Sequence, residues 1–202
     1  MKPTRFETAI ALIDKANSED INTYEVSGIN YPKELLYSQR MTRKLLQFEP
    51  NASKALQIAA RAQHICRWKI ARDEYPIDRL GYLKWRETLK RMHGDLTTDI
   101  LKQVGYDDQF TDRVKAIILK KLIKKNEESQ TIEDIICLVF LDYYFKSIDF
   151  NTEIKMQAEI AIEESDLILF VVDGQVGITK DEETIASILR GKKKDIIIVV
   201  NK

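Results

Sequence analysis

Apolar side chains recur every three or four residues along most of the first 150 positions, which is the period of an amphipathic α-helix. The first such stretch follows Thr4, and Glu7 stands three residues later, at the spacing of a capping box. Pro32 precedes the second stretch, where proline is typical of a helix start. The sequence therefore predicts that the chain begins with two helices.

The same period predicts a third helix that is capped by Asn51 or Ser53 and runs to about Trp68. A long helical segment follows over residues 78–103. Gly94 is expected to break it, because glycine is a poor helix former. We therefore expect two shorter helices in this segment rather than one.

Two further stripes complete the first part of the chain. One covers residues 110–122, and the other follows Thr131 and Asp134, which are spaced like a helix cap. No segment shows the strict alternation that is typical of a half-buried strand. Stripes of this kind are buried by packing helix on helix, so residues 1–150 are predicted to form an all-α domain.

After residue 150 the pattern changes. Residues 153–164 and 181–190 read as helices, whereas 167–172 and 196–200 are continuous apolar runs. Such runs are typical of strands that are buried on both faces of a parallel sheet. The expected fold class is thus mostly α, with a partial α/β segment of βαβ order over residues 151–202.

Composition excludes several partners and compartments. The chain has 32 basic and 32 acidic residues, so its net charge argues against both nucleic acid and membrane as partners. The longest apolar run, 135–141, is too short to cross a bilayer. Cys66 and Cys137 do not make a disulfide framework, and no secretory pattern opens the sequence. We therefore expect a cytoplasmic protein.

The neutral total conceals a basic segment that predicts an anionic ligand. Residues 40–91 carry 13 basic and five acidic side chains, a net charge of +8. Guanidinium groups bind phosphate or carboxylate in bidentate fashion, and aromatic rings offer faces for a base or sugar. The candidate ligand-binding residues are Arg40, Arg61, Arg67, Trp68, Arg72, Arg79, Tyr82, Trp85 and Arg86.

His64 and His93 are the two histidines of the chain, and either could be a hydrogen-bond donor or general base beside such a ligand. They are therefore the candidate catalytic residues, although the sequence leaves open whether the chain is an enzyme. The competing interpretation is that the tryptophans belong to the core and that the arginines pair with Asp73, Glu74, Asp78 and Glu87.

Several short stretches of residues 5–146 form a pattern that is specific to one family. They are Arg5-Phe6, residues 31–38, residues 62–68, Tyr75-Pro76, Arg79, Gly81-Tyr82, Trp85-Arg86, residues 104–106 and residues 134–141. On these stretches the segment resembles the family called domain of unknown function 4202. The resemblance implies no established activity, so the chemistry of the residues has to support the functional argument.

The order of His64, His93 and Asp142 also resembles, faintly, the HD-type metal phosphohydrolases. That resemblance implies an HD-like fold and a divalent metal held by these three residues. Ile65 follows His64 where that family has aspartate, and no histidine lies on the upstream helix. A metal site requires its full ligand set. The leading expectation is therefore that no cofactor or metal is bound, with a degenerate phosphohydrolase as the alternative.

The last part of the chain, residues 151–202, contains three informative stretches, 157–173, 181–183 and 199–202. On these stretches it resembles part of the first G domain of the ribosome-assembly GTPases called Der or EngA. It implies that Asn201 and Lys202 open the guanine-specificity motif of a GTP-binding protein. No G-x-x-x-x-G-K-[ST] loop is present to hold phosphates, and the printed sequence stops before the specificity aspartate. We therefore expect this GTPase-like segment to be non-functional.

The function expected from the sequence is thus the binding of a small phosphorylated or nucleotide-like anion by the helical domain. A protein derived from a ribosome-assembly GTPase is a further alternative, and an accidental join near Phe150 is another. Two strands alone cannot bury both faces of a sheet, so the unpaired strands of the last segment are expected either to dock on the helical domain or to cause self-association.

Overall fold

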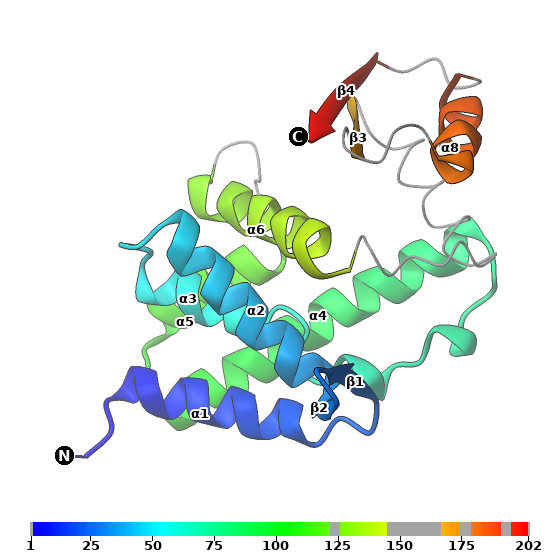
Figure 1. The fold of residues 1–202 in the computed structure, drawn as a ribbon. Helices are drawn as coiled ribbons and strands as arrows, with labels where there is room; N and C mark the ends of the chain where they lie inside the picture. Colours follow the sequence, from blue (N-terminus) through cyan, green and yellow to red (C-terminus); the bar gives the residue numbers. More distant parts are fainter. Residues whose placement is uncertain (1, 122–125, 145–166, 174–178, 191–194, 202) are drawn as a thin grey trace. The chain divides into compact units, whose positions relative to one another are not determined.

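The computed structural model describes residues 2–121, 126–144, 167–173, 179–190 and 195–201 (Figure 1). The chain divides into two compact units, Met1–Ser147 and Ile148–Lys202. Each unit is taken separately below. No helix in the described ranges combines the length and apolar character that crossing a bilayer requires.

The first unit is built mainly of α-helices. Its helices are α1 (Arg5–Ser18), α2 (Lys33–Phe48), α3 (Lys54–Ala62), α4 (Arg79–Gln103), α5 (Asp108–Ile118) and α6 (Glu127–Tyr143). Two 3₁₀ helices, η1 (Arg67–Lys69) and η2 (Arg72–Glu74), lie between α3 and α4. The mostly helical architecture that the apolar periodicity predicts is confirmed, whereas nothing identifies it as HD-like.

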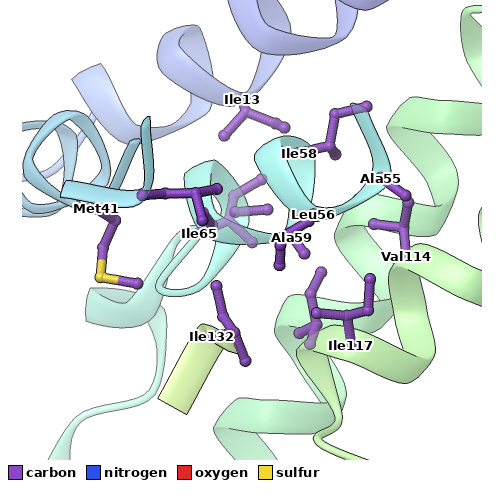
Figure 2. Packing of buried hydrophobic residues seen from close by; sticks show 14 of the residues in the cluster. Ile13, Met41, Ala55, Leu56, Ile58, Ala59, Ile65, Val114, Ile117 and Ile132 are labelled. Atoms are coloured by element: carbon purple, nitrogen blue, oxygen red, sulfur yellow. The ribbon is translucent and has the colours of Figure 1, made fainter. Parts of the chain in front are cut away.

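The short helix α3 lies at the centre of the core and contacts α1, α2, α5 and α6. Its side chains Ala55, Leu56, Ile58, Ala59 and Ala60 are all buried (Figure 2). Alanine brings little side-chain volume, so neighbouring helices can approach the α3 backbone from several sides. Burial of each large aliphatic side chain here contributes roughly 1.5–3 kcal/mol.

Side-chain caps begin most of these helices. The Thr4–Glu7 capping box is confirmed, and Ser53 rather than Asn51 caps α3 by accepting a hydrogen bond from the Leu56 N–H at 3.1 Å. The predicted cap at Thr131 is wrong. Helix α6 begins earlier, where the side chain of Asn126 accepts from the Ser129 N–H, so Thr131 lies inside the helix.

Helix α3 ends at Ala62, before the predicted end at Trp68. Cys66 has a left-handed backbone with φ of 54°, a conformation that cannot continue a right-handed helix. The Cys66 N–H donates to the side-chain oxygen of Asn17 at 3.0 Å, and this contact from α1 helps to hold the turn. A contact distant in sequence therefore overrides the local helical pattern.

The predicted break at Gly94 is also wrong, because α4 continues through it to Gln103. Gly94 is buried, and a Cβ added there would lie 3.3 Å from the Cγ of Lys115 and 3.5 Å from a methyl carbon of Leu119. The glycine thus permits the chain after α4 to pack closely against this helix.

A small hairpin corrects the expectation of an all-α domain. Strands β1 (Thr23–Val26) and β2 (Ile29–Pro32) pair antiparallel, with Val26 opposite Ile29. Ser27 and Gly28 form the two-residue turn with φ of 52° and 80°, the positive values that tight hairpin turns require. The strands are only four residues long, which is too short for their alternation to stand out in the sequence.

In the second unit, β3 (Leu167–Asp173) pairs parallel with β4 (Asp195–Asn201), and α8 (Lys180–Arg190) lies between them in sequence. This confirms the strand–helix–strand order expected there. The helix predicted over residues 153–164 lies outside the described residues.

Candidate functional site

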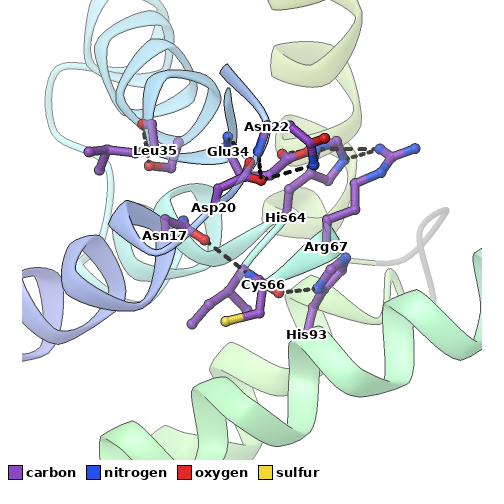
Figure 3. A network of polar contacts seen from close by, with 11 residues as sticks. Asn17, Asp20, Asn22, Glu34, Leu35, His64, Cys66, Arg67 and His93 are labelled. Atoms are coloured by element: carbon purple, nitrogen blue, oxygen red, sulfur yellow. Dashed lines mark hydrogen bonds and ion pairs between the residues drawn. The ribbon is translucent and has the colours of Figure 1, made fainter. Parts of the chain in front are cut away.

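The turn that follows α3 places His64 between a carboxylate and a guanidinium group. The Nδ1 atom of His64 lies 3.2 Å from Oε2 of Glu34, which belongs to α2. An Nη1 atom of Arg67 lies 3.5 Å from Nδ1 and 3.3 Å from Nε2 of the same ring. Figure 3 shows the three side chains pointing toward one another.

The environment keeps His64 neutral while leaving it partly open to solvent. Its ring stacks on Tyr37 with centroids 4.0 Å apart, and 22% of its side chain is exposed, against 8% for Glu34. Burial, reinforced by the charge of Arg67, holds the pKa of His64 well below its usual value. Burial also raises the pKa of Glu34, although Arg67 opposes that rise.

His93 lies next to His64, and its ring is hydrogen-bonded to the protein backbone. Its Nδ1 donates to the backbone carbonyl of Ile65 at 2.8 Å, and the two imidazole centroids are 6.0 Å apart. Burial lowers the pKa of His93 to about 3. Of the two candidate catalytic residues, His64 is therefore the one that a ligand can reach.

Backbone contacts at the end of α1 and the start of α2 position the carboxylate. One side-chain oxygen of Asp20 accepts from the Glu34 N–H at 2.9 Å, and the other accepts from the backbone and side chain of Asn22. Asp20 is itself buried. The first turn of α2, which carries Glu34, is thereby fixed next to the turn that carries His64.

Three arginines surround two aromatic rings beside this turn. The guanidinium carbon of Arg67 lies 4.9 Å from the Trp85 ring centroid, and that of Arg72 lies 5.9 Å from both Trp85 and Tyr82. Arg86 lies 5.7 Å from Tyr82. Cation–π contacts of this kind hold the guanidinium groups in place.

Trp85 acts as a support rather than as an open surface. Its ring is buried, and its Nε1 donates to the Ile70 carbonyl at 3.0 Å. The half-buried Tyr82 offers the more accessible ring. Tyr82 is therefore better placed than Trp85 for direct contact with a ligand.

The positive charge of this cluster is not offset by the acidic residues next to it in sequence. Glu74 accepts from the Ala71 N–H, Asp78 caps α4 through the Gly81 N–H, and Glu87 pairs with Lys90 and Arg91. Among the residues that the structure describes, Arg67, Arg72 and Arg86 have no carboxylate ion pair. A buried Nη2 of Arg72 also lacks a hydrogen-bond acceptor. We name His64, Arg67, Arg72, Tyr82 and Arg86 the arginine cluster.

Other predicted ligand residues lie elsewhere. Arg61 binds Asp14 through two hydrogen bonds of 2.6 Å each, so its guanidinium group is already occupied. Arg79 is exposed in the first turn of α4, and Trp68 packs at the edge of the core. Because α3 ends before it, Trp68 does not share a continuous helix face with Arg61.

Arg40 occupies an aromatic box of its own. Its guanidinium carbon lies 5.1 Å from the ring of Tyr24, 4.3 Å from that of Tyr143 and 5.3 Å from that of Tyr144. Arg40 is buried, and an Nη1 atom has no hydrogen-bond acceptor. The three rings lie around the guanidinium group, and the ligand-binding role expected for Arg40 stays a prediction.

The three residues of the HD-type alternative do not assemble a metal site. Asp142 pairs with Lys44 and has a 42% exposed side chain. No group of three or more potential ligands that could hold a metal ion occurs within the described residues. The residues present thus do not fit the divalent metal that this resemblance implies.

In the second unit, Asn201 ends β4 opposite Asp173 of β3, and Lys202 lies outside the described residues. The nucleotide-binding role that the GTPase resemblance implies for this pair stays a prediction.

The sequence reasoning missed Glu34 as a site residue. Glu34 stands one turn before Tyr37 and Ser38 and two turns before Met41, so it shares a helix face with them, and all four are buried. A carboxylate on the buried face of an amphipathic helix requires a polar partner, which was the available signal.

Comparison with known proteins gives two separate results. The model of the family described as "Domain of unknown function (DUF4202)" matches residues 7–163. GTPase Der of Heliobacterium modesticaldum is 52% identical over 62 residues, which are 31% of this chain and 14% of that protein. GTPase Der of Mycoplasmopsis pulmonis and that of Lactococcus lactis are each 55% identical over 53 residues, 26% of this chain and 12% of theirs.

This chain therefore spans only a small part of the length of these GTPases. No solved structure matches it. The match to the DUF4202 model extends past the helical unit, which ends at Ser147, and into the second unit.

Proposed function

This chain belongs to the DUF4202 family, and we propose that its helical unit binds a phosphorylated or nucleotide-like small anion at the arginine cluster. The observation that carries this proposal is the gathering of Arg67, Arg72 and Arg86 without a carboxylate ion pair among the described residues. Guanidinium groups that are held by aromatic rings are preorganised for bidentate contact with a phosphoryl group.

We propose that different parts of the ligand contact different parts of the site. Arg67 and Arg72 flank the buried ring of Trp85, so their donors are the natural contacts for the phosphoryl oxygens. The half-buried ring of Tyr82, within 6 Å of the guanidinium carbons of both Arg72 and Arg86, is available to an aromatic or sugar portion. His64 contacts Arg67 within the cluster.

The test is a calorimetric titration of the 202-residue protein with inorganic phosphate, adenosine 5′-phosphate and adenosine. We expect adenosine 5′-phosphate to bind and adenosine, which lacks the anion, to bind far more weakly. Loss of a hydrogen bond to a charged group costs about 1.5–3 kcal/mol, so Arg67→Ala and Arg86→Ala should each weaken binding by roughly 10- to 100-fold.

Arg91→Ala supplies the matched control. Arg91 lies on α4 and is exposed, like Arg86, but unlike Arg86 it pairs with Glu87. The Arg91→Ala protein should bind the anions as the wild type does. An equal loss of affinity in Arg86→Ala and Arg91→Ala would show that the effect comes from the overall charge of the protein and not from this site. Absence of binding by the wild type would refute the proposal.

We propose further that the second unit of this 202-residue chain does not bind GTP. The sequence contains no G-x-x-x-x-G-K-[ST] loop, whose backbone N–H groups and lysine hold the phosphates in GTPases. GTP should therefore raise the melting temperature no more in the wild type than in Asn201→Ala. A larger rise in the wild type would show that the segment is a working nucleotide site.

A further inference from the structure

The two partners of His64 define which of its nitrogen atoms carries the proton. A carboxylate can only accept a hydrogen bond, and a guanidinium group can only donate one. Glu34 approaches Nδ1 at 3.2 Å, so a proton on Nδ1 satisfies that contact. Arg67 then faces an unprotonated Nε2. These two contacts therefore favour the neutral Nδ1–H tautomer of His64, in which Nε2 is a hydrogen-bond acceptor.

Arg67 does not saturate that acceptor. Its Nη1 atom lies 3.3 Å from Nε2 and 3.5 Å from Nδ1, so it is not directed at Nε2 alone. A contact of 3.3 Å is longer than a typical hydrogen bond from an N–H donor. With 22% of the side chain exposed, His64 can accept a better-aligned hydrogen bond from a bound molecule.

We propose that the arginine cluster selects a hydroxylated phosphate ester, such as a sugar or polyol phosphate. The phosphoryl group binds Arg67 and its neighbouring guanidinium groups, and a hydroxyl of the same ligand donates to Nε2 of His64. This assignment rests on the proposed function. A neutral acceptor directly beside a cationic donor is complementary to a molecule that carries an anion and a hydroxyl close together.

Glu34 is the positioning residue of this arrangement. Its helix turn is held by Asp20, and Tyr37 from the same helix stacks on the imidazole with an interplanar angle of 10°. The ring therefore has both its plane and its tautomer set before a ligand arrives. Such preorganisation reduces the ordering that binding would otherwise require.

The first experiment compares two probes, glycerol 1-phosphate and propyl phosphate, which share charge and chain length and differ only in two hydroxyl groups. Titrations of the ¹⁵N-labelled 202-residue protein are followed by NMR, which measures weak binding. One neutral hydrogen bond should make glycerol 1-phosphate bind about three- to tenfold tighter than propyl phosphate. The imidazole ¹⁵N shifts of free His64 should report a protonated Nδ1 and an unprotonated Nε2.

Four variants distinguish loss of the hydroxyl contact from a general disruption of the site. In His64→Phe, which keeps a ring on Tyr37 but has no acceptor, the affinity ratio of the two probes should fall to about one. His64→Gln, which restores an acceptor oxygen, should recover part of the ratio. Glu34→Leu should lower the ratio because the tautomer is no longer fixed. Arg91→Ala should leave both affinities unchanged, because that side chain is 72% exposed and outside the site.

The outcomes distinguish this inference from the function on which it rests. If both probes bind the wild type equally, or if its spectrum shows a protonated Nε2 in the free protein, the hydroxyl assignment is wrong although anion binding stands. If neither probe binds, this inference fails, and the titration with adenosine 5′-phosphate decides separately whether the proposed function stands.

Discussion

Arg61 and Arg67 are six positions apart and chemically identical, yet their guanidinium groups have different partners. Arg61 closes on Asp14 with two hydrogen bonds of 2.6 Å, whereas Arg67 contacts only the ring nitrogens of His64 and the face of Trp85 among the described residues. A guanidinium group that is bound by a carboxylate has little left for a ligand. At the scale of single residues, therefore, the acidic partner decides which arginine is structural.

The ion pair of Arg61 predicts a stability cost. Asp14→Ala leaves a guanidinium group, whose side chain is only 12% exposed, without its partner. We expect a loss of about 2–3 kcal/mol in the free energy of unfolding, measured by urea denaturation. Glu87→Ala breaks pairs on the surface and should cost less than about 1 kcal/mol. Equal costs would contradict this distinction.

The two histidines, whose pKa values the fold lowers, predict a loss of stability in mild acid. His93 has a folded-state pKa of about 3 against an ordinary 6.5, and the pKa of His64 is lowered as well. Below pH 6.5 the unfolded chain takes up protons that the folded chain does not. Stability is therefore full above pH 6.5 and falls by about 1.4 kcal/mol per pH unit for each histidine that stays neutral.

Urea denaturation between pH 7.5 and pH 5 measures this slope. Protonation of Glu34, whose pKa burial raises, opposes the loss toward the acidic end. His64→Gln should reduce the slope by about half, because His93 alone then contributes. A wild-type stability that is constant from pH 7.5 to pH 5 would show that the imidazoles are not held neutral.

At the scale of elements, the segment between α3 and α4 builds the site. It leaves α3 after Ala62, turns at the left-handed Cys66, passes through η1 and η2, and returns to the first turn of α4. Gly81 there is buried, and a Cβ added to it would lie 2.1 Å from the Pro76 carbonyl oxygen. The close approach of this segment to α4 thus depends on a glycine.

Substitution of two glycines in α4 by alanine should therefore have different effects on stability. Gly81→Ala forces the backbone at Pro76 to move, and we expect a loss of about 2–3 kcal/mol. Gly94→Ala meets the flexible side chain of Lys115 at 3.3 Å and gains helix propensity, so its stability should stay within about 1 kcal/mol of the wild type. Thermal unfolding of both variants checks this, and a larger loss in Gly94→Ala would contradict it.

At the scale of the whole molecule, the two units differ in how they bury apolar surface. The helical unit encloses a core in which Ile13, Leu56 and Ile117 are fully buried. In the second unit, Ile198 of β4 is 64% exposed and Val200 is 53% exposed. Apolar strands with so much exposed surface are a recognised cause of association between chains.

The exposed strand predicts concentration-dependent self-association of the 202-residue chain. Ile198→Lys places a charge on β4 and should shift the protein toward monomer in sedimentation velocity. Ser187→Lys adds the same charge at an exposed position of α8 and should not. Equal behaviour of the two variants would show that β4 is not the contact.

The sequence by itself determined the helices of the first unit, the parallel strands of the second and the arginine-rich character of residues 40–91. These features follow from local periodicity, capping and composition, which act between near neighbours in the chain. Ser53 could therefore be recognised as a cap, and the strand run 167–172 as a strand, without any knowledge of the fold.

Only the tertiary structure decided which of these residues meet. Glu34 and His64 are 30 positions apart, and Arg61 and Asp14 are 47 apart. The early end of α3 likewise depends on Asn17, which reaches Cys66 across 49 positions. Contacts over such separations are set by the packing of whole helices around α3. Local pattern therefore supplied the candidate residues, and helix packing selected the arginine cluster from among them.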